Sequence, residues 1–217
     1  MKHGLIFDLD GTLVDSLQGI ADSLNRALQS VGLPGHSLEK VRGFIGNGSR
    51  VLIERGVPEG SNESFIDTVE QVFKADYESN WPQGTFAYEG INELLESLHS
   101  HGYPLAVLSN KPHPFTLAMV TRLFPSIDFA VVLGQLAGIP HKPDPTGALE
   151  ISNILRLRPQ DCTVIGDSTM DIETAQNAGM QSIGVTWGFH DHDRLVAAGA
   201  DRLVHAPQEL LMNDWGS

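Results

Sequence analysis

The sequence predicts an α/β fold, a doubly wound parallel sheet with an α-helical segment inserted after its first strand. Two observations support this prediction. From Pro104 onward, continuous apolar runs alternate with helical patterns, which is typical of parallel strands covered by helices on both faces. Between Ser16 and about Gly84, by contrast, the pattern is helical and contains no convincing strand.

The first expected strand, Leu5–Leu9, is followed by three helical patterns. The first ends at Gly32 and Pro34, the second ends at the sequence "GNGS", and the third has Ser64 as its expected N-cap. Their apolar positions are, in turn, Ile20, Leu24, Ala27, Leu28 and Val31; Leu38, Val41 and Ile45; and Phe65, Val69, Val72, Phe73 and Tyr77.

The remaining strands are expected in "PLAVLSN", "FAVVLG", "CTVIGD", "QSIGVTW" and "RLVH". The helices between them are expected in "PFTLAMVTRLF", "TGALEISNILRLR", "DIETAQNAGM" and "HDRLVAAGA". We therefore expect residues 1–15 and 85–217 to form an α/β core and residues 16–84 to form a helical cap. Helices packed onto the same core, without a separate module, are the alternative. Ligands of such sheets bind beyond the carboxyl ends of the strands.

The charge of the chain limits its partners. Lys and Arg number 14 against 27 Asp and Glu, a formal charge of −13 over 217 residues. Such a field repels nucleic acid and anionic membranes, whereas a small anion can bind where a cation reverses the local charge. No apolar run is long enough for a signal peptide or a membrane span, and the single Cys162 fits a reducing compartment. We expect a cytoplasmic monomer or homodimer.

Polar side chains that could take part in catalysis or ligand binding follow four of the predicted strands. In chain order they are Asp8 and Asp10, then Ser109, then Lys142, then Asp167 with Asp171. At one edge of a sheet these side chains would form a single site. Clustered carboxylates repel one another unless a cation compensates them, and oxygen-only ligands favour Mg²⁺.

The lysine and the hydroxyl in this set suit an anion held beside the metal. Lys142, Ser109 and the backbone amides around Gly11 and Thr12 would then hold a phosphoryl group. An aspartate that touches both the metal and the phosphorus can act as a nucleophile and form an aspartyl-phosphate.

Four segments resemble the signature motifs of the haloacid dehalogenase (HAD) superfamily: "DLDGT" (Asp8–Thr12), "LSNK" (Leu108–Lys111), "HKPDP" (His141–Pro145) and "GDSTMD" (Gly166–Asp171). The resemblance covers essentially the whole chain, and the position of the helical insertion is similar to the phosphoglycolate phosphatase branch. It implies an HAD-like core with a helical cap. It also implies an Mg²⁺-dependent phosphatase that acts on a small phosphorylated metabolite, with 2-phosphoglycolate as the first candidate.

The resemblance also implies a role for each matching residue. Asp8 is the expected nucleophile, and Asp10 is the acid that protonates the leaving group and the base that activates water. Mg²⁺ is expected on Asp8, Asp167 and the backbone carbonyl of Asp10. Asp171 is expected to bind it through water or to orient Asn110 or Lys142. The residues expected to hold the phosphoryl group are Ser109, Asn110, Lys142, Gly11 and Thr12.

In the expected cap, Arg42, Asn47 and Arg50 are candidate contacts for the rest of the substrate, because arginines can pair with a carboxylate. Solvated surface charges are an equally open interpretation. The "GNG" turn is similar to the phosphoglycolate phosphatases. The sequence departs from them at "AYEGI", where Glu89 would disfavour a carboxylate substrate unless it faces solvent.

Other functions are compatible with parts of this pattern. A phosphosugar mutase similar to β-phosphoglucomutase shares the motifs, and another small phosphate ester or pyrophosphate is an alternative substrate. A dehalogenase needs no Mg²⁺, and the presence of both Asp10 and Asp167 argues against it. A non-enzymatic phosphate-binding protein is disfavoured because no motif residue is missing, and a receiver would not need the insertion. We interpret "HDHD" at 190–193 as a solvated loop.

Overall fold

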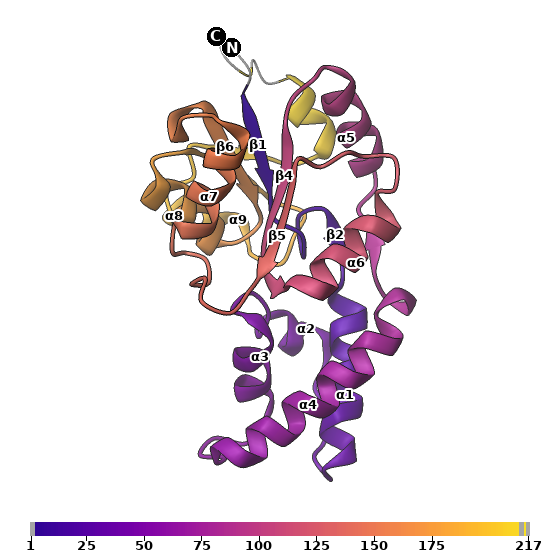
Figure 1. Ribbon diagram of the computed structural model, residues 1–217. Helices are drawn as coiled ribbons and strands as arrows, with labels where there is room; N and C mark the ends of the chain where they lie inside the picture. The colour runs from indigo at the N-terminus through magenta and orange to yellow at the C-terminus, as the bar shows by residue number, and fades with distance from the viewer. Residues whose placement is uncertain (1–2, 213–214, 216–217) are drawn as a thin grey trace. The chain divides into compact units, whose positions relative to one another are not determined.

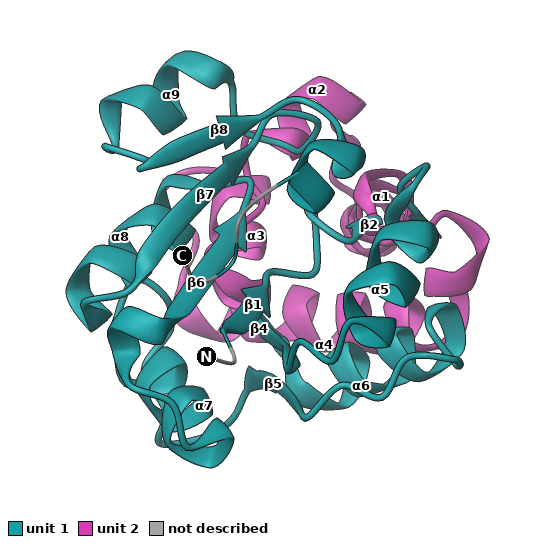
Figure 2. Ribbon diagram, turned by 90° about the horizontal axis from the view of Figure 1, so that it is seen from above, with its two compact units in different colours: residues 1–14, 87–217 teal, residues 15–86 magenta. Residues whose placement is uncertain are grey.

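The computed structural model describes residues 3–212 and residue 215. The chain divides into two compact units, one made of residues 1–14 and 87–217 and the other of residues 15–86 (Figures 1 and 2). Where the chain passes between them, two short strands, β2 (Val14–Asp15) and β3 (Phe86–Ala87), pair with each other. Among the described residues, no helix has the length and apolar character needed to cross a membrane.

The first unit contains a six-stranded sheet in the order β5-β4-β1-β6-β7-β8, and every neighbouring pair is parallel. The strands are β1 (Gly4–Phe7), β4 (Leu105–Pro112), β5 (Val131–Gln135), β6 (Cys162–Gly166), β7 (Gln181–Val185) and β8 (Arg202–Val204). After β1 the chain adds β4 and then β5 on one side of β1, and it then crosses to β6 on the other side of β1. The carboxyl end of β1 is therefore the point where the strand order reverses, which is where ligands bind in open α/β sheets.

Helices cover both faces of this sheet, so the α/β fold class that the sequence predicts is confirmed. Figure 2 shows α7 (Thr146–Leu155) and α8 (Thr169–Ala178) on one face and α5 (Ile91–Ser100) on the other. The unit also contains α6 (His113–Leu123), α9 (His192–Ala197) and two 3-10 helices, Pro159–Asp161 and Pro207–Met212. Strand and helix side chains such as Ile6, Val164 and Ile151 are fully buried in one core, and Cys162 packs among them. Their burial is the main favourable term in holding the helices to the sheet.

The second unit is all helical apart from its connecting strands. It consists of α1 (Leu17–Ser30), α2 (Leu38–Arg42), α3 (Gly48–Gly56), α4 (Glu63–Asn80) and a 3-10 turn at Trp81–Gln83. Apolar side chains recur on the inner faces of α1 and α4, so that Leu24, Leu28, Val69 and Phe73 are buried. The rings of Phe73 and Tyr77 stack with centroids 5.5 Å apart.

Three details of the second unit differ from the sequence predictions. The second helix ends at Arg42, so Ile45 lies outside it, because Gly43 caps the helix. The segment interpreted as a turn leads directly into an additional helix, α3. The longest helix begins at Glu63, with Asn62 rather than Ser64 as its N-cap, because the Asn62 side chain accepts a hydrogen bond from the Phe65 amide at 2.9 Å.

Candidate active site

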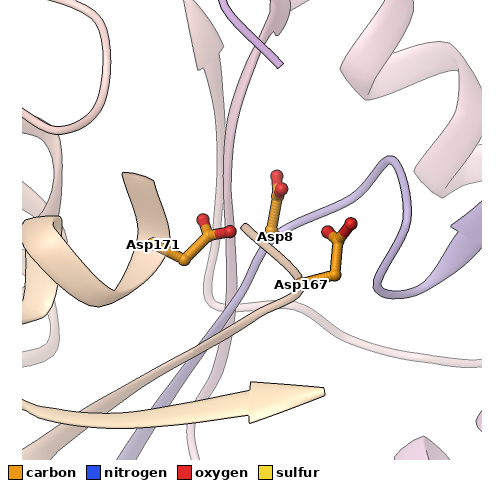
Figure 3. Close-up of side chains that lie close together, drawn as sticks. All are labelled: Asp8, Asp167 and Asp171. Carbon is orange, nitrogen blue, oxygen red and sulfur yellow. The ribbon is translucent and has the colours of Figure 1, made fainter. Parts of the chain in front are cut away.

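The polar residues that the sequence predicts to gather do lie at the carboxyl edge of the sheet. Asp8 follows β1 and Asp167 follows β6, while Asp171 lies in the first turn of α8. One oxygen from each of these three buried carboxylates lies within 4.8 Å of the others. Figure 3 shows the side chains of Asp171 and Asp167 on either side of Asp8. Strands that are far apart in sequence thus bring three acids into one cluster.

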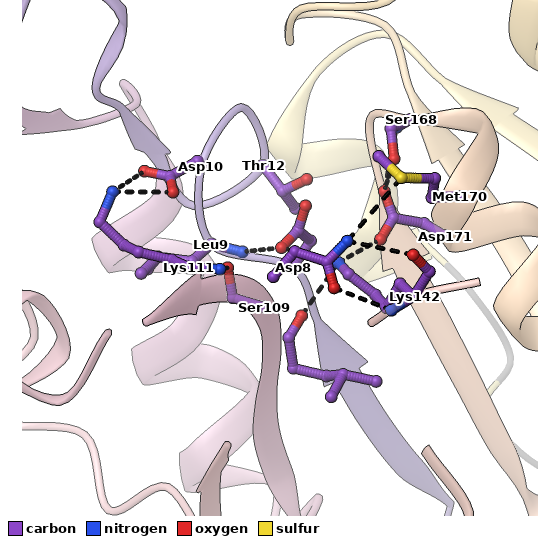
Figure 4. A network of polar contacts seen from close by, with 12 residues as sticks. Asp8, Leu9, Asp10, Thr12, Ser109, Lys111, Lys142, Ser168, Met170 and Asp171 are labelled. Atoms are coloured by element: carbon purple, nitrogen blue, oxygen red, sulfur yellow. Dashed lines mark hydrogen bonds and ion pairs between the residues drawn. The ribbon is translucent and has the colours of Figure 1, made fainter. Parts of the chain in front are cut away.

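Lys142, in the loop after β5, is bound into this cluster. Its Nζ lies 2.9 Å from Asp8 Oδ1 and 2.6 Å from Asp171 Oδ1, and it donates to the Leu108 carbonyl at 3.1 Å (Figure 4). These contacts match the three hydrogen atoms of an ammonium group. Asp8 Oδ1 also accepts from the Leu9 amide at 2.7 Å. The lysine therefore compensates part of the acid charge itself, in addition to the phosphate-holding role that the sequence analysis expects of it.

Asp171 is fixed in place by the start of its own helix. Ser168 and Asp171 form a capping box, in which the Ser168 backbone amide donates to Asp171 Oδ2 at 3.0 Å. The Ser168 hydroxyl also donates to Asp171 Oδ2, at 2.6 Å. A side chain at Gly166 would place its Cβ 2.1 Å from Asp171 Cγ, so only glycine fits there. With one oxygen on Ser168 and the other on Lys142, Asp171 orients the lysine, as one of the two predicted roles requires.

Asp167 is held by two loops. Its Oδ1 accepts from the Thr12 hydroxyl at 3.0 Å and its Oδ2 accepts from the Phe189 amide at 2.7 Å. Trp187 Nε1 donates to the Thr12 carbonyl at 3.0 Å, so the loop after β7 closes over the first motif. The sequence analysis did not single out this loop, because its contribution is a backbone amide that carries no residue signature.

Gly11 allows the first motif to approach Asp167. Its φ is +89°, and a Cβ there would lie 2.3 Å from Asp167 Oδ2, so a larger residue is excluded by both conformation and space. The amides predicted to bind phosphate are engaged inside the loop, since Gly11 N donates to the Val14 carbonyl at 2.8 Å and Thr12 N to the Leu9 carbonyl at 3.3 Å. In this structure Gly11 and Thr12 therefore shape the loop and hold Asp167.

Burial and neighbouring charges shift the pKa values of this cluster. Desolvation raises the pKa of Asp8 to about 7, and neighbouring Asp171 adds to this effect, although Lys142 opposes it. Burial, together with the charges of Asp8 and Asp171, raises the pKa of Asp167 well above its usual range. Burial alone would lower the pKa of Lys142, but pairing with Asp171 and Asp8 outweighs it and raises the pKa.

The donor set suits a hard divalent cation. Of the three buried carboxylates, Lys142 contacts only Asp8 and Asp171, and burial raises the pKa of both Asp8 and Asp167. All the candidate ligand atoms are oxygens, which is the set that Mg²⁺ prefers. The residues present therefore fit an Mg²⁺ ion.

The second motif lies in an irregular part of β4. Leu108 pairs with Leu133 and Pro112 with Gln135, so three residues of β4 stand opposite one residue of β5. Such an irregularity breaks the alternation of a strand and redirects its side chains. The three residues are Ser109, Asn110 and Lys111, and all are buried. The sequence analysis expected Ser109 after the strand, whereas the structure places it inside β4.

The side chains of this irregular segment have different partners. Asn110 Nδ2 donates to the Lys142 carbonyl at 3.1 Å, and Asn110 Oδ1 accepts from the Lys142 amide at 2.8 Å. Asn110, predicted to hold phosphate, thus holds the backbone of the lysine loop. Ser109 Oγ accepts from the Lys111 amide at 3.2 Å. Lys111 Nζ contacts the carboxylate of Asp10 at 2.9 Å and 3.1 Å.

Lys111 is the site residue that the sequence analysis missed. It stands inside the quoted "LSNK" segment, so its position was the available signal. A lysine at the end of a strand is ordinarily a solvated residue, and only the fold shows that its ammonium is buried against Asp10.

Two of the three candidate substrate contacts of the second unit, Asn47 and Arg50, have partners within that unit. Asn47 Oδ1 accepts from Arg55 Nη2 at 3.0 Å, and Arg42 lies half-buried in the last turn of α2. The guanidinium of Arg50 is surrounded by acids of α3 and α4: Glu54, Glu63, Asp67 and Glu70. These ion pairs do not favour Arg50 as a substrate contact, and the solvated-charge alternative is closer to what the structure shows.

The "HDHD" segment is only partly a solvated loop. Asp191, His192 and Asp193 are exposed, as expected. His190 is half-buried, and its Nδ1 accepts from the Thr169 amide at 3.2 Å, in the first turn of α8. His190 thus accepts a hydrogen bond from one of the backbone amides at the helix N-terminus that have no partner within the helix. The local sequence does not indicate this contact.

Comparisons with known proteins agree with this geometry. The family model for haloacid dehalogenase-like hydrolases matches residues 5–185. A protein of Psychrobacter arcticus named phosphoglycolate phosphatase is 36% identical over 197 residues, 87% of this chain and 85% of that one. A Yersinia pestis protein of the same name is 34% identical over 212 residues, 96% of this chain and 91% of that one.

Solved structures share the whole fold. A structure from Lactobacillus delbrueckii subsp. bulgaricus superimposes with a TM-score of 0.92 at 31% identity and covers 100% of both chains. A structure from Haemophilus somnus gives a TM-score of 0.90 at 31% identity, with 97% of each chain covered. The chain therefore belongs to the family of haloacid dehalogenase-like hydrolases.

Proposed function

We propose that this protein is an Mg²⁺-dependent phosphatase that hydrolyses small phosphate monoesters, with 2-phosphoglycolate as its preferred substrate, through an aspartyl-phosphate. The observation that supports this most directly is the position of Asp8, a buried carboxylate held between Lys142 and a second acid, Asp167, at the reversal point of the sheet. The names of the relatives support the substrate, since two that are 36% and 34% identical are called phosphoglycolate phosphatases.

Asp8 and Asp167 would hold the metal directly. Asp171 would act through water, because both of its oxygens already accept hydrogen bonds from Ser168 and Lys142. When bound, the ion supplies positive charge that screens the oxygens of the transferring phosphoryl group. Lys142 and the hydroxyl of Ser109 hold the same group from the protein side, and Asn110 positions Lys142 through its backbone.

Each residue of the first motif has a chemical task in this proposal. An oxygen of Asp8 attacks phosphorus while the ester bond breaks, and Asp10 gives a proton to the leaving oxygen. Water then attacks the aspartyl-phosphate, Asp10 takes a proton from it, and inorganic phosphate leaves. The leaving group and the water use the same side of phosphorus, so one acid serves both steps. The site holds Asp8 and Asp10 on one short loop, which fits this division of work.

The helical unit at residues 16–84 is proposed as a cap that excludes water before the leaving group departs and contacts the rest of the substrate. Its connections are short: Asp15 lies in β2, and Gly84 directly follows the turn at 81–83. Arg42, half-buried in the last turn of α2, is proposed as one contact, because a guanidinium can pair with a substrate carboxylate. The acid at Glu89 is exposed, so the sequence-based objection to a carboxylate substrate is weakened.

The test is a panel of phosphate esters assayed with and without Mg²⁺ by release of inorganic phosphate. We expect 2-phosphoglycolate to give the highest kcat/KM, above ethyl phosphate, which lacks the carboxylate, and above p-nitrophenyl phosphate. Release of one phosphate per ester consumed separates hydrolysis from phosphoryl transfer back to a sugar. The substrate assignment fails if 2-phosphoglycolate ranks no better than ethyl phosphate, and the metal assignment fails if chelation leaves the rate unchanged.

A further inference from the structure

Lys111 is a buried lysine to which the mechanism above assigns no task. Its Nζ lies 2.9 Å from Asp10 Oδ2 and 3.1 Å from Asp10 Oδ1, so one ammonium contacts both oxygens of one carboxylate. The two side chains are only 6% and 14% exposed. Exposed ion pairs of this kind contribute little and rearrange freely, whereas a pair shielded from water fixes the orientation of its carboxylate.

The backbone of Lys111 is anchored on both sides. Its amide donates to Ser109 Oγ at 3.2 Å, and its carbonyl accepts from Thr116 Oγ1 at 3.1 Å. The residue lies in the irregular part of β4, where the strand departs from its regular pairing with β5. The lysine therefore starts from a fixed position, and the irregular strand is what directs it toward Asp10.

The site contains two lysines that serve different aspartates. Lys142 contacts Asp8 and Asp171, whereas Lys111 contacts Asp10. In Figure 4 the Asp10–Lys111 pair lies on one side of Asp8 and the Lys142 cluster on the other. Since each ammonium holds its own carboxylate, Lys142 cannot replace Lys111 in orienting Asp10.

We propose that Lys111 is a positioning residue that holds the Asp10 carboxylate facing the water molecule that breaks down the aspartyl-phosphate. This inference rests on the proposed function. In that step the water oxygen bonds to phosphorus, the bond from phosphorus to Asp8 breaks, and its electron pair returns to the Asp8 carboxylate. One proton of the water passes to Asp10. The same proton is available to the leaving oxygen of the next substrate molecule.

The two halves of the reaction depend on Lys111 to different extents. The contact of Lys111 Nζ with both oxygens of Asp10 fixes the orientation of that carboxylate, which must face the water when Asp10 acts as a base. With p-nitrophenyl phosphate the leaving phenolate needs no proton, so formation of the aspartyl-phosphate depends little on Asp10. Loss of the lysine should therefore slow breakdown of the intermediate much more than its formation.

The experiment compares the intact protein with Lys111→Met by rapid-quench kinetics on p-nitrophenyl phosphate with Mg²⁺. We expect a burst of about one p-nitrophenol per enzyme molecule, followed by turnover slowed about 100-fold, the scale of loss when a reacting group is misplaced. Intact-mass spectrometry of quenched samples should show the added phosphoryl group on most molecules. Lys111→Arg, which keeps a charged donor, should accumulate less of it.

A matched control separates this effect from loss of any lysine. Lys74 is 46% exposed and pairs with Glu70 at 2.8 Å in the helical unit, so Lys74→Met should show no burst and normal turnover. Thermal unfolding of both variants checks that each is folded. Comparing 2-phosphoglycolate with ethyl phosphate completes the set, because a lysine that binds the substrate carboxylate would raise KM for the first ester alone.

Three results would overturn the inference: a slow Lys111→Met variant without a burst, an arginine variant that accumulates as much phosphoenzyme as the methionine variant, or a KM effect confined to 2-phosphoglycolate. Any of these with an active wild-type protein refutes the role of Lys111 and leaves the proposed function standing. A wild-type protein that hydrolyses none of the esters refutes the proposed function and this inference together.

Discussion

Two clusters of charge in this protein have similar composition and opposite character. At the sheet edge, Lys142 is 4% exposed and contacts Asp8 and Asp171. In the helical unit, Arg50 is 30% exposed and lies among four acids: Glu54, Glu63, Asp67 and Glu70. Both clusters have more negative than positive charges. The first is buried, and the second is exposed to solvent.

The pKa values of acids in the two clusters are shifted in opposite directions. Burial raises the pKa of Asp8 to about 7 despite its contact with Lys142. Burial also acts on Glu70, but hydrogen bonds from Lys74 and Ser49 outweigh it and lower the pKa of that carboxyl. The comparison teaches that the number of charges does not make a reactive site. Desolvation makes the site reactive, because carboxylate oxygens that have lost their contact with water can instead bind a metal ion or attack a phosphorus atom.

The largest expected effect is that of Asp8→Asn. Removing the nucleophile should lower phosphate release by about 10⁴-fold or more, a loss typical of a deleted nucleophile. The same change should raise the unfolding temperature of the metal-free protein at pH 8, because it removes a buried negative charge. Steady-state assays and calorimetry measure the two effects.

The matched control for Asp8→Asn is Asp67→Asn in the exposed cluster, which contacts Arg50 at 2.5 Å. It should keep near-normal activity and show no gain in stability. Comparable losses of activity in both variants would contradict the distinction between the two clusters, and full activity of Asp8→Asn would contradict the mechanism.

Lys142→Met should give the next largest effect. It would leave Asp8 and Asp171 buried without their shared cation, and breaking a buried ion pair costs about 3–5 kcal/mol in the free energy of unfolding. Denaturant titration without Mg²⁺ measures this loss. A loss no greater than that of Arg50→Met would show that burial does not separate the clusters.

The pH dependence of metal binding tests the electrostatics directly. The folded-state pKa of Asp8, about 7, lies above its ordinary value of 3.8, so between these values the folded protein binds more protons than the unfolded chain. Stability of the metal-free protein should therefore fall as pH rises through this range, and the penalty should be complete above about pH 7. Mg²⁺ should raise the unfolding temperature more at pH 8 than at pH 6.

The measurement is thermal unfolding with and without Mg²⁺ at both pH values, with Asp8→Asn as the control that should lose most of the difference. Equal stabilisation by Mg²⁺ at pH 6 and pH 8 in the wild-type protein would show that Asp8 does not titrate in this window.

The smallest expected effect is that of Arg50→Met. Because Arg50 joins α3 to α4 through surface ion pairs, its loss should shift the unfolding temperature slightly and leave kcat/KM for 2-phosphoglycolate nearly unchanged. High salt should reduce even this shift. A rise in KM for 2-phosphoglycolate but not for ethyl phosphate would instead identify Arg50 as a substrate contact, as the sequence suggested.

The family and the sheet edge could be predicted from the sequence because local signals specify them. Apolar runs that end in Asp8 and Asp167 indicate strands whose carboxyl ends carry acids, and parallel strands bring those ends to one edge. The helical periodicity of residues 16–84 predicted an all-helical segment in the same way. The errors in this segment were at the ends of helices. Gly43 ends the second helix before Ile45, and Asn62 rather than Ser64 is the N-cap of the longest helix.

The sequence left the partners of the charged side chains open or missed them, since they depend on residues distant in the chain. The contact of Lys142 with Asp171, across 29 positions, was one of several roles expected for Asp171, and the contact of Lys111 with Asp10, across 101, was not expected. The amide of Phe189 that holds Asp167 has no sequence signature at all.

The sequence by itself determined which residue types stand at the ends of the strands, and therefore that acids, a hydroxyl and a lysine share one edge. Only the tertiary structure decided which cation serves which carboxylate: Lys142 for Asp8, Lys111 for Asp10, and Arg50 for the acids of its own helices. The physical reason is that pairing and desolvation depend on distance and burial, which arise when remote segments pack, whereas strand and helix formation depend on neighbours in the chain.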